Sequence, residues 1–220
     1  MLNAADFHST DRGFGMKSLL SIQRAWVLSR LAIEMVETPE MYTRFAIETW
    51  VESAMRYFTN RNFCVSDDKG YIYGYGRSIW AMIDTETRQP TDIFAINDGA
   101  ISQWIEPDRI CPIDKGGRVK MDEEAKLVRT IDTYYNDVDI NGHINSIKYI
   151  EHVLDLWPQS WYKEYSISRI EIAYVAEAHQ GDHLSFYLAQ VTDEVSCVRI
   201  CKDNGVEVAR SKVVFRHRLR

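Results

Sequence analysis

The sequence lacks the features that mark several large classes of protein. No apolar run approaches the roughly 20 residues that cross a bilayer. Residues 1–11 include acidic and polar side chains and no apolar core of a secretory signal, so we expect neither a membrane span nor a signal peptide. Acidic residues (32) outnumber Lys and Arg (26), which gives a net charge of −6. Nucleic-acid binding through bulk charge is therefore not expected, because it needs an excess of basic side chains.

Thiol, phosphate-binding and serine-hydrolase motifs are also missing. No two of the four cysteines form a C-x-x-C pair, so we interpret them as reduced structural thiols of a cytoplasmic protein. They are Cys64, Cys111, Cys197 and Cys201. No glycine-rich phosphate loop and no G-x-S-x-G elbow is present.

One pair of histidines could suggest a metal site. His179 and His183 lie four residues apart with Asp182 between them, at a predicted turn. No third ligand lies nearby in the sequence, so a solvated turn is favoured over a metal site.

The residues that are present predict a globular chain rich in strands. Hydrophobic residues make up 45% of the 220 and charged residues 26%, and a chain of this length buries roughly 70% of its unfolded surface. Alternating apolar and polar residues, many of them β-branched or aromatic, indicate strands. The predicted strands are 25–36, 44–51, 57–65 and 71–83 in the first half, and 126–135, 168–175, 184–191, 195–202 and 206–217 in the second.

Two segments predict helices instead. Between residues 144 and 157 the apolar side chains recur at spacings of three and four, which is a helical stripe, and Pro158 would end it. A second helix is expected from residue 2 to about residue 12, where Gly13 and Gly15 stop it.

The order of these elements suggests an internal duplication. Residues 29–36 (SRLAIEMV) match residues 168–175 (SRIEIAYV), and Arg77-Ser78 after one turn matches Arg210-Ser211 after another. Each half would be a long helix and an antiparallel sheet, an α+β unit. We expect a first domain at residues 1–90, a linker at 91–124 rich in Pro and Gly with a short helix near 100–104, and a second domain at 125–220.

One polar segment stands where a strand gives way to the second helix. Six of the residues 135–145 are acids, amides or imidazole. Helix capping explains one or two of them, but not His143 or the neighbouring Gly142. A helix N-terminus offers free N–H groups to a developing oxyanion, and a histidine moves protons near neutral pH. A lone histidine would be interpreted as structural, whereas the whole cluster favours a catalytic site.

The same segment resembles a known family. Residues 137–150 (DVDINGHINSIKYI) are similar to the D-L-D-x-N-x-H-V-N-N-x-K-Y-I signature of the acyl-ACP thioesterases of plants and bacteria. Residues 76–83 (GRSIWAMI) with Thr87-Arg88 resemble that family's R-x-S-x-W-x-M segment, and residues 26–30 (WVLSR) resemble its W-V-[LV]-[ST]-R segment. The matches cover most of the chain, and the long signature is the specific one.

The resemblance implies a fold and a set of site residues. The fold is a tandem, or double, hot-dog, in which each half is a long helix wrapped by an antiparallel sheet. The implied catalytic residues are Asp139, Asn141 and His143, with Glu177 as the fourth, because residues 172–178 (IAYVAEA) line up with the family's L-x-Y-x-x-E-C. The position that corresponds to Glu177 in the first half is Thr38, so that half lacks the acid.

Two departures from the family pattern change the expectation. Ala178 stands where many members have a cysteine, so water or Asp139 must attack the thioester. The family has a strand before its first helix, whereas this chain starts at what resembles that helix, so we expect the first sheet to be short of a strand.

The expected function is hydrolysis of fatty acyl-ACP to free fatty acid and acyl carrier protein, with no metal or organic cofactor. An acyl-CoA thioesterase of the same fold and a non-catalytic acyl-binding module remain as alternatives, and the oligomeric state stays open, a homodimer included. The last strand carries a basic face that is either a charge-protected sheet edge or a docking surface for the acidic carrier. Its residues are Arg210, Lys212, Arg216, Arg218 and Arg220.

Overall fold

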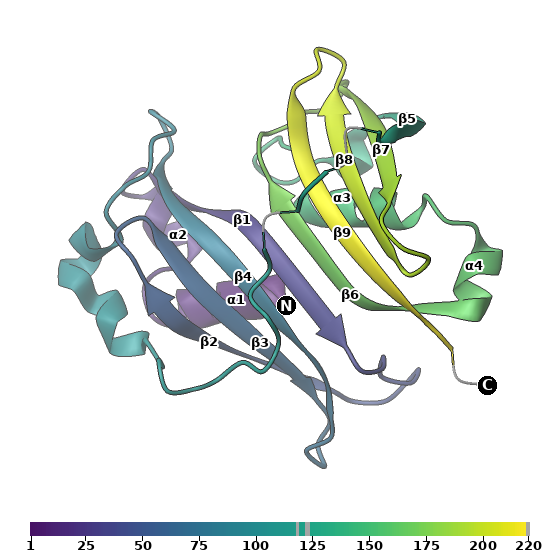
Figure 1. Cartoon of the computed structure of the whole chain (residues 1–220). Helices are drawn as coiled ribbons and strands as arrows, with labels where there is room; N and C mark the ends of the chain where they lie inside the picture. The colour runs from purple at the N-terminus through teal and green to yellow at the C-terminus, as the bar shows by residue number, and fades with distance from the viewer. Residues whose placement is uncertain (118, 122–123, 219–220) are drawn as a thin grey trace. The chain divides into compact units, whose positions relative to one another are not determined.

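The computed structural model describes residues 1–117, 119–121 and 124–218 and divides the chain into two compact units, residues 1–116 and 117–220 (Figure 1). The division falls inside the segment 91–124. Among the described residues, no helix is long and apolar enough to cross a membrane.

The first unit combines two short helices with an antiparallel sheet. Its strands follow the order β2-β3-β4-β1. The elements are α1 (Leu2–Thr10), α2 (Met16–Leu20), β1 (Arg24–Met35), β2 (Ala46–Ala54), β3 (Phe58–Ser66), β4 (Ile72–Asp84) and the 3-10 segment η1 (Ile93–Trp104).

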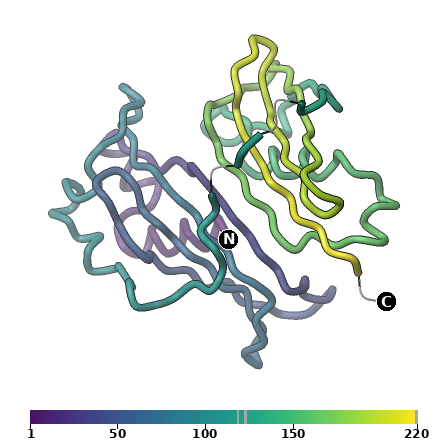
Figure 2. The backbone as a smooth tube through the Cα atoms, viewed as in Figure 1, coloured from purple at the N-terminus to yellow at the C-terminus, as the bar shows by residue number. Residues whose placement is uncertain are grey.

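The second unit has the same kinds of element and one more strand. Its sheet follows the order β6-β9-β8-β7-β5, and the chain path is clear in Figure 2. The elements are β5 (Lys126–Asp132), η2 (Tyr135–Asp137), α3 (Ser146–Leu154), α4 (Gln159–Glu164), β6 (Tyr165–Tyr174), β7 (His183–Gln190), β8 (Val195–Lys202) and β9 (Glu207–His217). β9 pairs with both β6 and β8, so the interpretation of the basic strand as a sheet edge is wrong.

The strand pairing confirms the duplication. The order β2-β3-β4-β1 repeats as β7-β8-β9-β6. A bulge interrupts β1 at Ser29 and β6 at Ser168, positions that the sequence match had paired. A second bulge falls between Val65 and Ser66 and again between Ile200 and Cys201. A β-bulge adds one residue to one strand at a specific place, so two shared bulges indicate a common ancestral unit.

The bulges also correct one detail of the predicted repeat. At the second bulge the corresponding residues of the two repeats lie 135 positions apart (65 and 200). By that offset the counterpart of Arg77 is Lys212. The match of Arg77 with Arg210 is therefore two residues out of register. The error is easy to make because side chains two apart share one face of a strand.

The helices are shorter than expected. α1 and α3 have nine residues each, and a second short helix follows each of them. A Cβ on Gly15 would lie 2.2 Å from Thr10 Oγ1, so the chain turns back tightly on the end of α1. In the second unit α3 ends at Leu154, and Pro158 is the N-cap of α4 instead of the end of α3. A proline disfavours helical geometry in the residue before it, which keeps the two helices separate.

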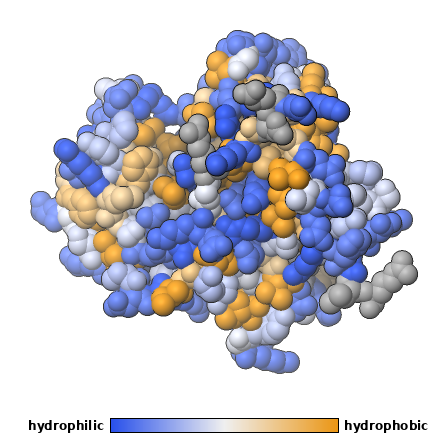
Figure 3. Space-filling view, in the orientation of Figure 1, coloured by the Kyte–Doolittle hydropathy of each residue, from blue (hydrophilic) through white to orange (hydrophobic). Residues whose placement is uncertain are grey.

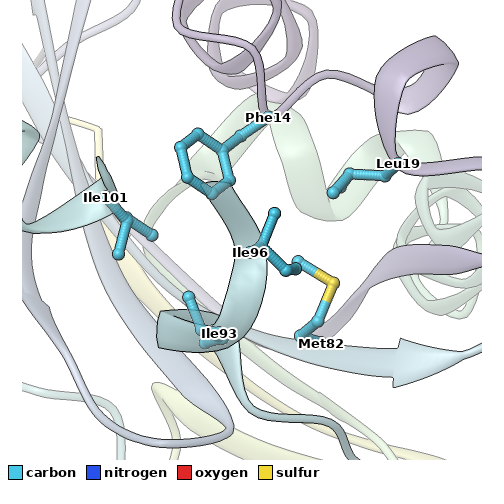
Figure 4. Packing of buried hydrophobic residues seen from close by; sticks show 6 residues of the cluster. All are labelled: Phe14, Leu19, Met82, Ile93, Ile96 and Ile101. Carbon is cyan, nitrogen blue, oxygen red and sulfur yellow. The ribbon is translucent and has the colours of Figure 1, made fainter. Parts of the chain in front are cut away.

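Each unit has its own buried core. In the first unit η1 packs its isoleucines against the start of the chain and β4, as Figure 4 shows. The cluster is Phe14, Leu19, Met82, Ile93, Ile96 and Ile101. In the second unit Leu184, Phe186, Val198 and Val213 are fully buried. On the face seen in Figure 3, apolar residues are scattered among polar ones, which is ordinary for a protein surface.

Candidate active site

The polar segment forms a closed loop between η2 and α3. The Asp139 N–H donates to the His143 carbonyl at 2.8 Å, and the Gly142 N–H donates to the Asp139 carbonyl at 3.0 Å. Val138 and Ile144 form a bridge across the base of the loop. Gly142 has φ +82°, and a Cβ there would meet no protein atom within 4 Å. Glycine is needed at this point for the left-handed backbone.

The Asp139 side chain holds this loop together from inside. Its Oδ1 accepts from the backbone N–H of Asn141 at 2.8 Å and from that of His143 at 3.2 Å. A carboxylate that accepts two backbone N–H groups fixes the local turn. The structure thus gives Asp139 an orienting position toward both neighbours.

His143 and Glu177 come together from different parts of the second unit. Glu177 follows β6, and its Oε2 lies 3.4 Å from His143 Nε2. The backbone brings them there, because the Ile144 N–H donates to the Ala178 carbonyl at 2.8 Å and His143 forms a bridge with His179. The side chains are 27% and 39% exposed, so a substrate can reach both. The carboxylate lies where it can orient the imidazole.

His179 and His183, the two histidines considered as metal ligands, make separate contacts. The His179 ring stands edge-on to His143, with centroids 5.1 Å apart. The His183 Nδ1 pairs with Asp203 at 2.5 Å and its Nε2 with Asp132 at 3.1 Å. Within the part of the chain that the structure describes, no three His, Cys, Asp or Glu side chains are arranged to hold a metal ion.

The start of α3 lies directly after the loop. Asn145 is its N-cap, and its side chain accepts from the Ile147 N–H at 2.9 Å. The helix begins at Ser146, two residues later than predicted, because Asn145 takes the capping position. The Tyr174 hydroxyl donates to the Ser146 carbonyl at 2.8 Å. Burial raises the pKa of Tyr174 above its ordinary value, so this hydroxyl stays protonated.

No thiol is available as a nucleophile at the site. Ala178, at the family's cysteine position, is fully buried. All four cysteines are free and buried, as predicted, and burial raises the pKa of each thiol. A raised pKa leaves little thiolate at neutral pH.

A cavity of about 520 Å³ lies elsewhere in the second unit. It opens beside the far end of β7 from His183 and contains none of the four predicted site residues. Its lining residues are Trp161, Tyr165, Gln190, Thr192, Asp193, Glu194 and His217.

The structure also shows an ionisable pair that sequence reasoning missed. His152 Nε2 lies 3.0 Å from Asp137 Oδ1, and both side chains are largely buried. The available signal was a histidine among apolar and charged side chains, seven residues after the polar segment.

Two models of protein families match the chain. They are the acyl-ACP thioesterase N-terminal domain over residues 1–96 and the C-terminal domain over residues 120–217. Among solved structures, an acyl-ACP thioesterase from Bacteroides thetaiotaomicron is 47% identical, with a TM-score of 0.91 over 98% of this chain and 86% of that one. The 12:0-ACP thioesterase from Umbellularia californica, at 22% identity, shares the fold with a TM-score of 0.81 over 98% of this chain and 86% of that one.

The curated relatives are longer proteins. Oleoyl-acyl carrier protein thioesterase 1, chloroplastic, of Arabidopsis thaliana is 25% identical over 96% of this chain and 60% of its own length. For the palmitoyl-acyl carrier protein thioesterase, chloroplastic, of Gossypium hirsutum the values are 24% identity, 87% of this chain and 50% of the relative. The chain therefore spans about half of the length of the curated relatives that it matches.

Proposed function

Since the chain belongs to the acyl-ACP thioesterase family, we propose that it hydrolyses the thioester of fatty acyl-ACP to free fatty acid and acyl carrier protein. Such a reaction would end fatty acid synthesis on the carrier. We also propose that each unit is a hot-dog domain. The repeated strand order and the packing of α3 against the sheet through Tyr149 and Tyr174 support this assignment.

The observation that carries the proposed chemistry is the His143–Glu177 contact of 3.4 Å beside a loop locked by Asp139. In the proposed reaction a water oxygen bonds to the thioester carbonyl carbon, and the carbon–sulfur bond breaks. The His143–Glu177 pair takes the proton of the water and returns it to the thiolate that leaves. Asn141, with N–H groups at the start of α3, would hold the carbonyl oxygen as negative charge develops on it.

Direct attack by water is the route that the position of Asp139 favours. Oδ1 of that carboxylate is already bonded to two N–H groups. A covalent route would require Asp139 to bond to the acyl carbon, and this would weaken the acceptor that holds Asn141 and His143 in place.

The experiment that tests the function measures turnover on a matched pair of substrates. The same acyl chain is supplied on acyl carrier protein and on coenzyme A, and released fatty acid and thiol are both quantified. Faster turnover of acyl-ACP supports the proposal. Faster turnover of acyl-CoA replaces the carrier but keeps the chemistry, and binding without turnover of either makes the chain an acyl-binding module.

Recognition of an acidic carrier needs a local basic surface, because the net charge of this chain is −6. The basic face of β9 remains our candidate, although part of it is used within the unit. Arg210 forms a salt bridge with Glu207, and Arg218 Nε donates to the Tyr162 carbonyl at 3.0 Å. Arg220 lies outside the described residues.

The docking surface is tested by Arg216→Glu. We expect a higher KM for acyl-ACP at low salt, a smaller effect at high salt, and little change for acyl-CoA. Equal loss on both substrates would make the strand structural only.

A further inference from the structure

The His152–Asp137 pair has no part in the chemistry described so far. Asp137 is buried, with 7% of its surface exposed, at the end of η2. His152 lies near the end of α3, and its Nε2 reaches Asp137 Oδ1 at 3.0 Å. A buried carboxylate is costly unless it accepts hydrogen bonds, so the partners of Asp137 show what it is built to hold.

Asp137 is bonded to both ends of the loop that holds Asp139, Asn141 and His143. Its Oδ2 accepts from the Tyr134 N–H at 2.8 Å, at the start of the turn that leads into the loop. Its backbone carbonyl accepts from the Asn145 N–H at 2.7 Å, where the loop meets α3. His152 adds a third connection, from the body of the helix to the base of the loop.

The surroundings of His152 indicate that the hydrogen bond to Asp137, and not packing, requires a histidine at this position. Its ring packs edge-on against Phe186, with centroids 6.3 Å apart, a contact that an aliphatic side chain could also make. Its Nδ1 is buried and has no hydrogen-bond partner among the residues that the structure describes. Leucine would fill the site without that unpaired nitrogen, so packing alone does not account for the imidazole.

We propose that His152 and Asp137 form a positioning pair that sets where Asn141 and His143 stand relative to Glu177. This inference rests on the proposed function, because its consequence is for the same site. Without the Nε2 donor, Oδ1 of the buried carboxylate loses its bond to His152, while Oδ2 keeps the Tyr134 N–H, and the base of the loop can shift away from α3. A displacement of about 1 Å at a catalytic group can cost about 10²-fold in rate.

The test compares two variants of His152. His152→Leu keeps the apolar packing and removes the donor, whereas His152→Gln keeps an N–H group near the position of Nε2. We expect His152→Leu to lower kcat roughly 10- to 100-fold while KM stays within about 2-fold, and His152→Gln to recover most of the loss. His183→Leu is the matched control: it breaks an exposed His–Asp pair of the same unit and should leave kcat unchanged.

A second readout does not depend on activity. The N–H groups of Asn141 and His143, which donate to Asp139, should exchange with solvent faster in His152→Leu than in the wild type, and near the wild-type rate in His152→Gln. Should His152→Leu fail to fold, Asp137→Asn, which weakens the same contact, is compared with the wild type instead.

The two readouts separate the two ideas. If the wild type hydrolyses no thioester, the proposed function fails and the exchange rates still decide the positioning role. If His152→Leu keeps the wild-type kcat and exchange rates, the pair positions nothing. If His152→Gln is as impaired as His152→Leu, the hydrogen bond to Asp137 is not the cause, and the inference is overturned.

Discussion

The two units share one strand order and two bulges, but they differ at the start of their first helix. In the second unit β5, η2 and a polar loop precede α3, and Asn145 caps it. In the first unit α1 begins at Leu2, and its N-cap makes no side-chain hydrogen bond. The position that corresponds to Glu177 is Thr38, an exposed residue in a loop. The two units thus share their strand order, whereas the residue that contacts His143 in the second unit, Glu177, corresponds to a threonine in the first.

The units also differ in the charges that they bury. The first unit buries Arg61, whose guanidinium donates to the hydroxyls of Thr49 and Ser9. Burial lowers the pKa of Arg61 to about 10, and the nearby Arg12 adds to the effect. The second unit buries the carboxylates of Asp137 and Glu171. The first unit thus buries a cation, whereas the second buries two carboxyl groups.

The largest expected effect is on kcat and comes from substitutions in the loop of the second unit. His143→Ala and Asn141→Ala should each lower kcat on acyl-ACP by roughly 10²–10⁴-fold, the range for loss of an acid–base group or an oxyanion donor. Thermal unfolding of each variant checks that the protein remains folded. Wild-type turnover in either variant would remove that residue from the site.

A smaller effect on kcat distinguishes two roles of Asp139, namely orienting its neighbours and attacking the thioester. Asp139→Asn keeps an oxygen that can accept from the N–H groups of Asn141 and His143, but it cannot act as a nucleophile. We expect Asp139→Asn to lose less than about 10-fold in kcat and Asp139→Ala considerably more, because only the alanine leaves both N–H groups unpaired. Equal, near-complete loss in both variants would favour the covalent route.

The stability of the folded chain at low pH should depend on the basic groups around His8 in the first unit. Burial, and then Arg61 and Arg12, lower the pKa of His8 from 6.5 to about 4. Between these values the unfolded chain binds a proton that the folded unit does not, so stability falls as pH drops from 6.5 toward 4. A shift of this size is worth about 3 kcal/mol, and the partial exposure of His8 to solvent reduces the expected loss to the order of 2 kcal/mol. His183 in the second unit behaves oppositely, because its hydrogen bond to Asp203 raises its pKa.

The check is denaturant unfolding of the full chain at several pH values. His8→Gln should flatten the decline below pH 6.5, since glutamine has no proton to bind. An identical decline in the wild type and in His8→Gln would show that other groups govern acid unfolding.

The smallest expected effect concerns thiols, which neither unit uses. Replacing Cys64, Cys111, Cys197 and Cys201 together by alanine should leave kcat within a few-fold of the wild type, although cavities in both cores will lower stability. Loss of all turnover in a folded variant would show that a cysteine takes part.

Much of this architecture could be predicted from the sequence, because alternation and turn residues act locally. The predicted strands agree with the nine strands of the described residues to within about three residues at their ends. β5 ends early, at Asp132, because Asp137 accepts from the Tyr134 N–H and closes a turn there. The short helices α2 and α4 were missed, since five or six residues carry too little periodicity.

The site was harder to predict in full. Asp139, Asn141 and His143 lie within five residues, so the sequence itself displays their clustering. Glu177 was predicted as a site residue from the family resemblance alone, because only the fold brings its carboxylate to His143. His152 and Asp137 lie 15 residues apart on two different elements. The sequence shows an unusual histidine in the helix, but it does not show which residue that histidine contacts.

The most direct test of the account compares the two corresponding positions of the repeat. The kcat for acyl-ACP is measured for Glu177→Ala and for Thr38→Ala under identical conditions. If the second repeat alone carries the chemistry, Glu177→Ala loses at least roughly 10²-fold and Thr38→Ala stays at the wild-type value. A wild-type kcat in Glu177→Ala, or an equal loss in Thr38→Ala, would contradict it.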